Sequence, residues 1–434
     1  EWVSGKAETP FGARDYKLWV PANINHRKPA PLVMMLHGCM QSPDDLATIS
    51  GMNGVADQNG FLVVYPAQTK EANPLRCWNW FDPKHQARGA GEPAILAAIV
   101  QQVKASQKVD ANRTFIAGIS AGGAMAVVMG ATYSDIFRAV GSCAGLAYRS
   151  ATTAEGGLAA MKAGGPDPAA SVAEIAEAIA PLFPRRARHR LPVIVFQGDA
   201  DPYVKPVNAD QIIAQWTGIN DRLDDKKANQ SVKSTAAQTE KGEIPGGHTF
   251  ERAIYRDRGG RILIEKWSVS GLGHAWSGSP AAVTFADPKG PNASQQLWRF
   301  FAAGEPPVAV RDAMVAAYVA HSHSVREMLR VVFLSDEFYA RATTDEQIKS
   351  PLEMYVGTLR SLEASRDIVE YGGFRFYIYN TFIMGQTLFF PPNVKGWDGG
   401  RKWINTSTLI ARYNFTNSVA TIRGPGYQLV DVAT

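Results

Sequence analysis

The pentapeptide Gly118-Ile119-Ser120-Ala121-Gly122 carries the residue types of a nucleophile elbow. In such an elbow a sharp turn joins a buried strand to a helix, and glycines two residues before and after the serine let the backbone segments approach closely. The run 114–117 before the turn is strand-like, and residues 123–128 after it are small and helix-like. The pattern therefore predicts that Ser120 is a nucleophile, the group needed for acyl transfer.

A serine becomes a nucleophile at neutral pH only when a neighbouring base accepts its proton and an acid orients that base. In hydrolases of this sheet type the chain order is serine, acid, histidine. Asp199 and Asp201 follow the apolar strand 193–196, and His274 lies in a glycine-flanked loop after the strand 261–267. We expect His274 to be the base and Asp201 the acid, because Asp199 follows its strand directly and suits the turn itself.

Acyl transfer also needs two backbone N–H groups that face the oxyanion of the tetrahedral intermediate. In this type of fold one comes from the residue after the nucleophile and the other from a loop after an early strand. Ala121 supplies the first, and we expect Cys39 to supply the second, because the segment 37–40 follows the apolar run 31–36. We interpret His37 as a structural residue of this loop, since the donors are backbone groups.

These residues require a sheet whose strands end at one edge. Strand-like apolar runs alternate with helix-like segments, one of them opened by Pro93, which predicts a mostly parallel sheet covered by helices. The strand-like runs are 16–20, 31–36, 61–65, 114–117, 139–143, 193–196 and 261–267. Residues 146 to about 190 form an insertion with one amphipathic helix near 171–180, either a cap over the site or a surface excursion. The polar stretch 220–248 is interpreted as a loop.

The composition bounds the class of protein. With 434 residues, 45% of them hydrophobic and 20% charged, the chain is expected to be soluble and globular, with one large and one smaller domain. It has no apolar stretch of transmembrane length. The net charge of +5 is small for this length, and the basic run 185–190 has no interleaved aromatic residues, so we expect no nucleic-acid partner. The oligomeric state stays open.

The segment Gly304-Glu305-Pro306-Pro307 marks a change in composition. We predict a hydrolase domain over 1–303, a linker over 304–310 and a smaller, mainly helical domain over 311–434. His321 and His323 lie two residues apart on a predicted helix and so point to different faces, which makes a metal pair unexpected. We expect no metal and no organic cofactor.

Five motifs resemble, in the right order, the extracellular polyhydroxybutyrate depolymerase family of esterases. They are LHGCMQ at 36–41, RCWNWF at 76–81, RGAGEP at 88–93, GISAGG at 118–123 and GLGHAW at 271–276. The resemblance runs from about residue 10 to 303 and implies an α/β-hydrolase fold. By position, Ser120 is similar to the family's nucleophile, Asp201 to its acid and His274 to its base, and the amides of Cys39 and Ala121 are similar to its oxyanion hole.

The same resemblance implies a secreted serine esterase, extracellular or periplasmic, that acts on short-chain polyhydroxyalkanoates. A start at Glu1 rather than methionine suits a processed product or a trimmed one. The nearer alternative is an esterase for feruloyl or acetylxylan esters of plant cell walls, or for synthetic polyesters. The more distant alternative is a binding module on an inert hydrolase scaffold.

Three cysteines allow at most one internal disulfide and do not by themselves settle the compartment. The family resemblance implies that Cys39 pairs with Cys77, a bond that a secreted protein permits. Cys143 would then be a buried free thiol.

The resemblance also implies that Trp78, Trp80 and Trp276 lie near the site. Their flat faces would suit an aliphatic ester chain or a phenolic ring, so we expect them to bind substrate. The alternative is that these large apolar side chains build the core.

Residues from about 310 to 420 resemble the C-terminal end of a large exported bacterial family of unknown function. The segments that carry this likeness are 338–339, 348–353, 391–397 and 403–407. Only that end is present, and it brings no site residues. Its aromatic residues either bind polymer or build a helical core: Phe389, Phe390, Trp397 and Trp403.

Overall fold

The computed structural model describes residues 1–24, 28–182 and 190–302 and short parts of the C-terminal region, namely 317, 326–327, 330–331, 381–384, 406–421, 423–424 and 427–428. The chain divides into two compact units, Glu1–Glu305 and Pro306–Thr434. The expected linker and most of the expected helical domain lie outside the described residues, including the two histidines at 321 and 323 and the four aromatic residues Phe389, Phe390, Trp397 and Trp403. The same is true of 185–189 in the basic run.

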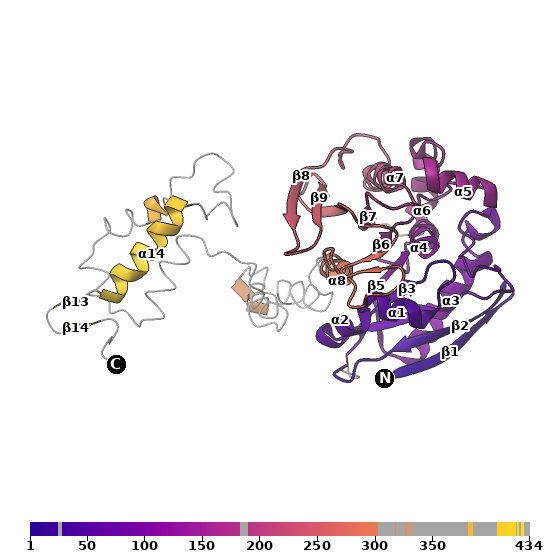
Figure 1. The fold of residues 1–434 in the computed structure, drawn as a ribbon, viewed down its shortest axis with the longest axis horizontal. Helices are drawn as coiled ribbons and strands as arrows, with labels where there is room; N and C mark the ends of the chain where they lie inside the picture. The colour runs from indigo at the N-terminus through magenta and orange to yellow at the C-terminus, as the bar shows by residue number, and fades with distance from the viewer. Residues whose placement is uncertain are drawn as a thin grey trace. The chain divides into compact units, whose positions relative to one another are not determined.

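A ten-stranded sheet forms the centre of the first unit (Figure 1). Its strand order is β1-β2-β4-β3-β5-β6-β7-β10-β9-β8. The strands are β1 (Trp2–Thr9), β2 (Gly12–Trp19), β3 (Ala30–Leu36), β4 (Leu62–Pro66), β5 (Val109–Ile119), β6 (Val140–Cys143), β7 (Val193–Gly198), β8 (Gln238–Glu243), β9 (Thr249–Arg256) and β10 (Ile262–Val269). All pairings from β4 through β10 are parallel, and the outer ones are antiparallel, which confirms the expected mostly parallel central sheet.

Helices cover both faces of this sheet. They are α1 (Pro43–Ser50), α2 (Met52–Asn59), α3 (Gly91–Ser106), α4 (Ala121–Thr132), α5 (Ala154–Ala163), α6 (Val172–Ile179), α7 (Val207–Leu223) and α8 (Ala293–Ala302). Three short 3₁₀ helices, η1 (Pro83–His85), η2 (Pro168–Ser171) and η3 (Ala180–Leu182), and the two-residue strands β11 (Trp276–Ser277) and β12 (Ala286–Asp287) complete the first unit. None of the helices in the described residues has both the length and the apolarity to span a membrane.

Alternate residues of the central strands pack into two separate cores. On β3, Leu32, Met34 and Leu36 join the cluster that also holds apolar side chains of α3, α4 and α7. Val33 and Met35 join the cluster on the other face, with α1, α2 and α8. Because both faces are buried, β3 is apolar at nearly every position, and a shift of register by one residue would exchange the two faces.

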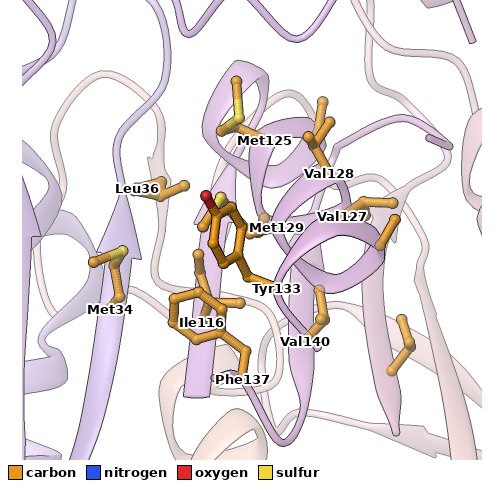
Figure 2. Packing of buried hydrophobic residues seen from close by; sticks show 14 of the residues in the cluster. Met34, Leu36, Ile116, Met125, Val127, Val128, Met129, Tyr133, Phe137 and Val140 are labelled. Carbon is orange, nitrogen blue, oxygen red and sulfur yellow. The ribbon is translucent and has the colours of Figure 1, made fainter. Parts of the chain in front are cut away.

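Helix α4 is buried on every side, since all twelve of its residues are buried. Figure 2 shows Met125, Val127, Val128 and Met129 of this helix among side chains of the sheet. Its glycines and alanines allow the helix to lie close to the strands that flank it, β5 and β6. The helix that follows Ser120 is therefore fixed by the core.

Two sequence expectations are corrected at the edges of the sheet. The stretch 220–248 is not one loop, because α7 continues to Leu223 and β8 occupies Gln238–Glu243. The edge strand β1 was not expected either. Each of these strands pairs on one side only and is largely exposed, so its sequence is polar and carries little of the hydrophobic signal of a strand.

The described part of the 146–190 insertion belongs to the helix layer. Its amphipathic helix is confirmed as α6, which packs on α7, and a Cβ at Gly218 of α7 would lie 3.0 Å from Val172. The carbonyl of Met161 in α5 accepts the N–H of Lys205 at 2.8 Å. The insertion thus supports the segment that follows β7.

In the second unit, the described elements are α14 (Thr406–Thr421) and an antiparallel pair of two-residue strands, β13 (Arg423–Gly424) and β14 (Tyr427–Gln428).

Candidate active site

The parallel strands bring three loops to one edge of the sheet. Ser120 follows β5, Asp201 follows β7 and His274 follows β10. The register aligns the strand ends across the sheet, through the pairs Ile119 with Cys143, Cys143 with Phe196, and Phe196 with Trp267. Since parallel strands present their carboxyl ends together, residues far apart in the chain share this edge.

Ser120 adopts the strained backbone of an elbow. Its φ of 58° and ψ of −124° lie in a region that non-glycine residues rarely occupy, at a cost of about 1–3 kcal/mol. Two backbone hydrogen bonds hold the turn: its N–H donates to Cys143 at 2.9 Å, and its carbonyl accepts from Ala124 at 3.0 Å. Ser120 is the residue directly before α4.

The glycines around the elbow are required by close approach of backbone segments. A Cβ on Gly122 would lie 2.1 Å from the carbonyl oxygen of Leu36, and one on Gly118 would lie 2.5 Å from that of Gly122. A Cβ on Gly38 would lie 3.3 Å from the Cβ of Ser120. The loop after β3 therefore lies against Ser120.

His274 is bonded to the acid expected from the sequence. Its Nδ1 lies 2.7 Å from Oδ2 of Asp201, whose side chain is fully buried. The other carboxylate oxygen accepts the N–H groups of Tyr203 and Val204 at 2.8 and 2.9 Å. Because an ionised carboxylate only accepts, Nδ1 carries the proton, and Nε2 of a neutral ring keeps its lone pair.

Asp199 serves a different purpose. Its Oδ1 accepts the N–H of Gly271 at 2.6 Å, at the start of the loop that carries His274. A Cβ on Gly198 would lie 2.0 Å from the carbonyl oxygen of Leu272, so the two loops also touch through their backbones. Asp199 thus holds a turn, while Asp201 contacts the imidazole.

No hydrogen bond joins the hydroxyl of Ser120 to the imidazole of His274 within the described part of the chain. Catalytic hydrogen bonds are often long in the absence of substrate and tighten in the complex. The structure thus brings together Asp201 and His274, and it places Ser120 at the same edge of the sheet.

Two aromatic rings beside His274 were not expected from the sequence. Tyr203 is 57% exposed, and its ring meets the imidazole edge-on at a centroid distance of 5.4 Å. Phe285 lies at 6.1 Å and has a φ of 65°. Tyr203 was within reach of sequence reasoning, since it lies two residues after the acid. Phe285 gives no such signal, because its position depends on a turn between β11 and β12.

The structure corrects the expected role of the tryptophans. Trp78 and Trp276 are 0% exposed and Trp80 is 5% exposed, so none of them presents a ring face to a ligand. Trp78 and Trp80 belong to the core on one face of the sheet, and Trp276 belongs to the other, where its Nε1 donates to Ser294. Burial of such large apolar surfaces stabilises the fold, which is the alternative the sequence left open.

The backbone N–H groups of Cys39 and Ala121 have no acceptor in the portions of the chain that the structure describes. Ala121 is the first residue of α4, where an N–H has no partner within the helix. Cys39 lies next to Gly38, which borders Ser120. Both N–H groups can therefore donate to another acceptor.

His37 holds the loop that carries Cys39. Its Nδ1 donates to the carbonyl of Gly38 at 2.7 Å, and its Nε2 accepts the N–H of Gln68 at 3.0 Å. These bonds require a neutral ring, and burial lowers the pKa of His37 from 6.5 to about 4. The side chain has the structural role expected for it.

We predict that this histidine makes folding sensitive to acid. In the unfolded chain His37 takes a proton below its ordinary pKa of 6.5, whereas in the folded chain it does so only near 4. The unfolded state binds more protons in this window, so the free energy of unfolding falls as the pH drops, by up to about 3 kcal/mol. Urea unfolding at pH 7, 6 and 5 measures this. A His37→Gln variant should show a shallower dependence, and identical slopes in both proteins would refute the prediction.

Cys39 and Cys77 form the expected disulfide, and Cys143 is a free, buried thiol. Two hydrogen bonds accompany the disulfide: Met40 donates its N–H to Leu75 at 2.6 Å, and the guanidinium of Arg76 donates to the carbonyl of Met40 at 3.1 Å. The loop after β3 is thereby joined to the segment 75–77.

Loss of this disulfide is expected to destabilise the fold. The bond closes a loop of 38 residues, and a model of loop-closure entropy gives it about 3–4 kcal/mol. The double variant Cys39→Ser and Cys77→Ser should unfold at correspondingly lower urea concentration. Adding reductant should shift the unfolding of the native protein and leave the double variant unchanged. If full reduction, verified by mass, leaves the native transition in place, the prediction fails.

Comparison with known families finds two matches along the chain. Residues 14–239 match the model of the family described as Esterase PHB depolymerase, a range that contains Ser120 and Asp201 and ends before His274. Residues 287–433 match the model of a second family, described as Protein of unknown function (DUF1800). Both resemblances seen in the motifs are confirmed.

The named relatives include depolymerases and esterases. Poly(3-hydroxyalkanoate) depolymerase C of Paucimonas lemoignei is 30% identical over 258 residues, and Feruloyl esterase B of Neurospora crassa is 28% identical over 224. The first match covers 59% of this chain and 56% of the depolymerase, and the second covers 50% and 73%. The chain thus spans little more than half the length of that depolymerase.

Among solved structures, an acetyl xylan esterase from Aspergillus awamori superposes with a TM-score of 0.53 at 19% identity. The superposition covers 70% of this chain and 100% of that one. A likeness at this level of identity speaks for the architecture alone, and with the sheet order above it shows an α/β-hydrolase fold.

Proposed function

Because the chain belongs to the esterase PHB depolymerase family, we propose that it is a secreted serine esterase that hydrolyses carboxylic esters through an acyl-enzyme. One observation carries the proposal. The Nδ1 of His274 is bonded to the buried Asp201 at the same edge of the sheet at which the elbow presents Ser120. This arrangement can hold the base in the tautomer that accepts a proton from serine.

In the first half of the reaction, Ser120 Oγ attacks the ester carbonyl and its proton passes to Nε2 of His274. Asp201 stabilises the imidazolium that forms. The negative charge on the carbonyl oxygen is received by the N–H groups of Cys39 and Ala121. Collapse of the tetrahedral intermediate expels the alcohol, which takes the proton from His274 and leaves an acyl group on Ser120.

In the second half, water attacks the acyl group, and His274 accepts a proton from that water. The new tetrahedral oxyanion meets the same two N–H groups. As it collapses, the carboxylic acid leaves and Ser120 recovers its proton from His274. Atoms balance with water as the only further reactant.

The preferred substrate under this proposal is a short-chain polyhydroxyalkanoate. The relative from Paucimonas lemoignei bears the name of such a depolymerase. Exposed apolar side chains on the loops around the site suit an aliphatic polyester, namely Met40 and Leu75 beside the disulfide and Tyr203 beside His274. The disulfide supports an oxidising compartment, extracellular or periplasmic.

The second candidate is a feruloyl or acetylxylan esterase. It is favoured by the relative from Neurospora crassa, which bears the name of a feruloyl esterase. Parallel incubation with polyhydroxybutyrate film, methyl ferulate and acetylated xylan separates the two, with Ser120→Ala as the blank. We expect 3-hydroxybutyrate and its oligomers to be released from the film at a rate at least about tenfold above that of the other products. Release of ferulate or acetate with an intact film would assign the chain to the second candidate.

A binding module on an inert scaffold is tested with a fluorophosphonate, which bonds covalently to an activated serine. We expect one equivalent of reagent, located at Ser120 by peptide mass. An unlabelled protein of native stability would overturn the esterase proposal.

A further inference from the structure

Glu92 is a fully buried carboxylate that the reaction above does not use. It lies in the first turn of α3, and four donors face its two oxygens. The side-chain amides of Gln68 and Asn79 donate to Oε1 at 2.5 and 2.8 Å, and the backbone N–H of Asn79 donates to Oε2 at 2.8 Å. The guanidinium of Arg14, also buried, lies 3.5 Å from Oε1. So many donors match a group that only accepts, which is the ionised form.

One route leads from this carboxylate through Gln68 to the loop after β3. The amide that donates to Glu92 also donates to the carbonyl of Cys77 at 2.9 Å, and its Oε1 accepts Nε of Arg14 at 2.7 Å. With its side chain fixed in this way, the backbone N–H of Gln68 donates to Nε2 of His37. His37 in turn holds the carbonyl of Gly38, the residue before Cys39.

A second route leads through Asn79 to the same residue. Both the backbone N–H and the side chain of Asn79 are bonded to Glu92, which fixes the segment 77–79 against α3. Cys77 begins that segment and is joined to Cys39 by the disulfide. The two routes start at one carboxylate and converge on the proposed oxyanion donor, one through the carbonyl of Gly38 and the other through the disulfide.

We infer that Glu92 is a positioning residue for catalysis: it fixes, through Gln68 and Asn79, the loop whose Cys39 N–H receives the oxyanion. This inference rests on the proposed function. A donor contributes to catalysis only when it already points at the site where charge develops, and a small displacement of it lowers the rate without changing the chemistry of the nucleophile. Glu92 touches neither Ser120 nor His274 and acts through the loop alone.

The substitution Glu92→Gln tests this directly. It keeps the size of the side chain but turns one acceptor oxygen into a donor NH₂ group, which must face another donor. We expect kcat for p-nitrophenyl butyrate to fall by about 10- to 100-fold, with KM changed by less than about threefold. The rate of fluorophosphonate labelling at Ser120 should fall by the same factor, because that reaction also places an oxyanion in the site.

The pH profile separates a displaced oxyanion loop from a disturbed acid and base. Since Asp201 and His274 stay bonded in the variant, the profile of kcat/KM against pH should keep its midpoint and lose only amplitude. A shifted midpoint would mean that the acid and base are disturbed, and it would overturn the assignment of Glu92 to the oxyanion loop.

Glu265 on β10 offers a matched control. It is also fully buried, and its carboxylate accepts hydrogen bonds from Arg252, Arg299 and Trp267. These hydrogen bonds do not lead to the loop after β3. Glu265→Gln should lower the melting temperature while kcat stays within about threefold of the native value. If both variants lose kcat in proportion to their loss of stability, Glu92 is merely structural and the inference fails.

A second variant keeps the inference testable if Glu92→Gln does not fold. Gln68→Ala breaks the link between Glu92 and Cys77 but leaves the other donors on Glu92, and it should lower kcat by at least about fivefold with little change in KM. Native kcat in a folded Glu92→Gln or Gln68→Ala protein would overturn the inference. Ser120→Ala distinguishes a failure of the proposed function from a failure of the role of Glu92. If the Ser120→Ala protein is active, the proposed function is refuted. If it is inactive while Glu92→Gln keeps native activity, only the role of Glu92 is refuted.

Discussion

Replacing the proposed nucleophile, as Ser120→Ala, is expected to lower kcat for p-nitrophenyl butyrate by about 10⁴- to 10⁶-fold. Without Oγ no acyl-enzyme can form, and only the oxyanion donors remain to assist direct attack by water. Initial rates with purified protein measure the effect. Fluorophosphonate labelling should disappear in the same variant, which ties the lost activity to this hydroxyl.

The fold should survive this change. The strain at Ser120 lies in its backbone, which two hydrogen bonds and the burial of α4 hold in place, and alanine is no larger than serine. A matched control is Ser134→Ala, since the hydroxyl of Ser134 is buried without a hydrogen-bond partner in the described structure. That variant should keep native activity. Activity above about 1% in Ser120→Ala, free of host esterases, would contradict the mechanism.

The second large effect is expected from Asp201→Asn, which should lower kcat by about 10⁴-fold. The amide has nearly the same shape but cannot stabilise an imidazolium, and its NH₂ group favours the tautomer of His274 in which Nε2 carries the proton. Such a ring cannot accept a proton from Ser120. The rate of acylation, measured as the burst of p-nitrophenol, should fall with kcat.

Asp199→Asn is the comparison that decides between the two acids. Asp199 accepts only the N–H of Gly271 in this region, and an asparagine oxygen can accept the same bond. Its kcat should therefore stay within about tenfold of the native value. A larger loss in Asp199→Asn than in Asp201→Asn would exchange the roles of the two carboxylates.

The parts of the fold that the sequence predicted well are those with continuous apolar patterns. Strands such as β3 and β7 are buried on both faces, so each appears as an uninterrupted apolar run. The elbow could be predicted equally well, because close packing against Leu36 admits only glycine at position 122. The roles of Ser120, Asp201 and His274 stay predictions until variants are assayed, as do the domain limits.

The features that the sequence did not reveal depend on how deeply a side chain is buried and on contacts between residues far apart in the chain. A motif placed Trp78 and Trp80 near the site but could not tell whether their rings face solvent or the core. The surroundings of Glu92 were hidden for a similar reason, since its partners Arg14 and Gln68 lie 78 and 24 residues away in the chain. Such contacts follow from the folded arrangement of loops and leave no local pattern.

The free thiol of Cys143, on the strand next to Ser120, gives the protein an intrinsic reporter of motion. The carbonyl of Cys143 accepts the N–H of Ser120, and its thiol is buried, which raises the pKa of the thiol and excludes reagents for sulfhydryl groups from it in the folded state. Modification of Cys143 therefore requires that this part of the sheet open. Its kinetics would follow local opening of the strands beside the elbow, without any engineered label.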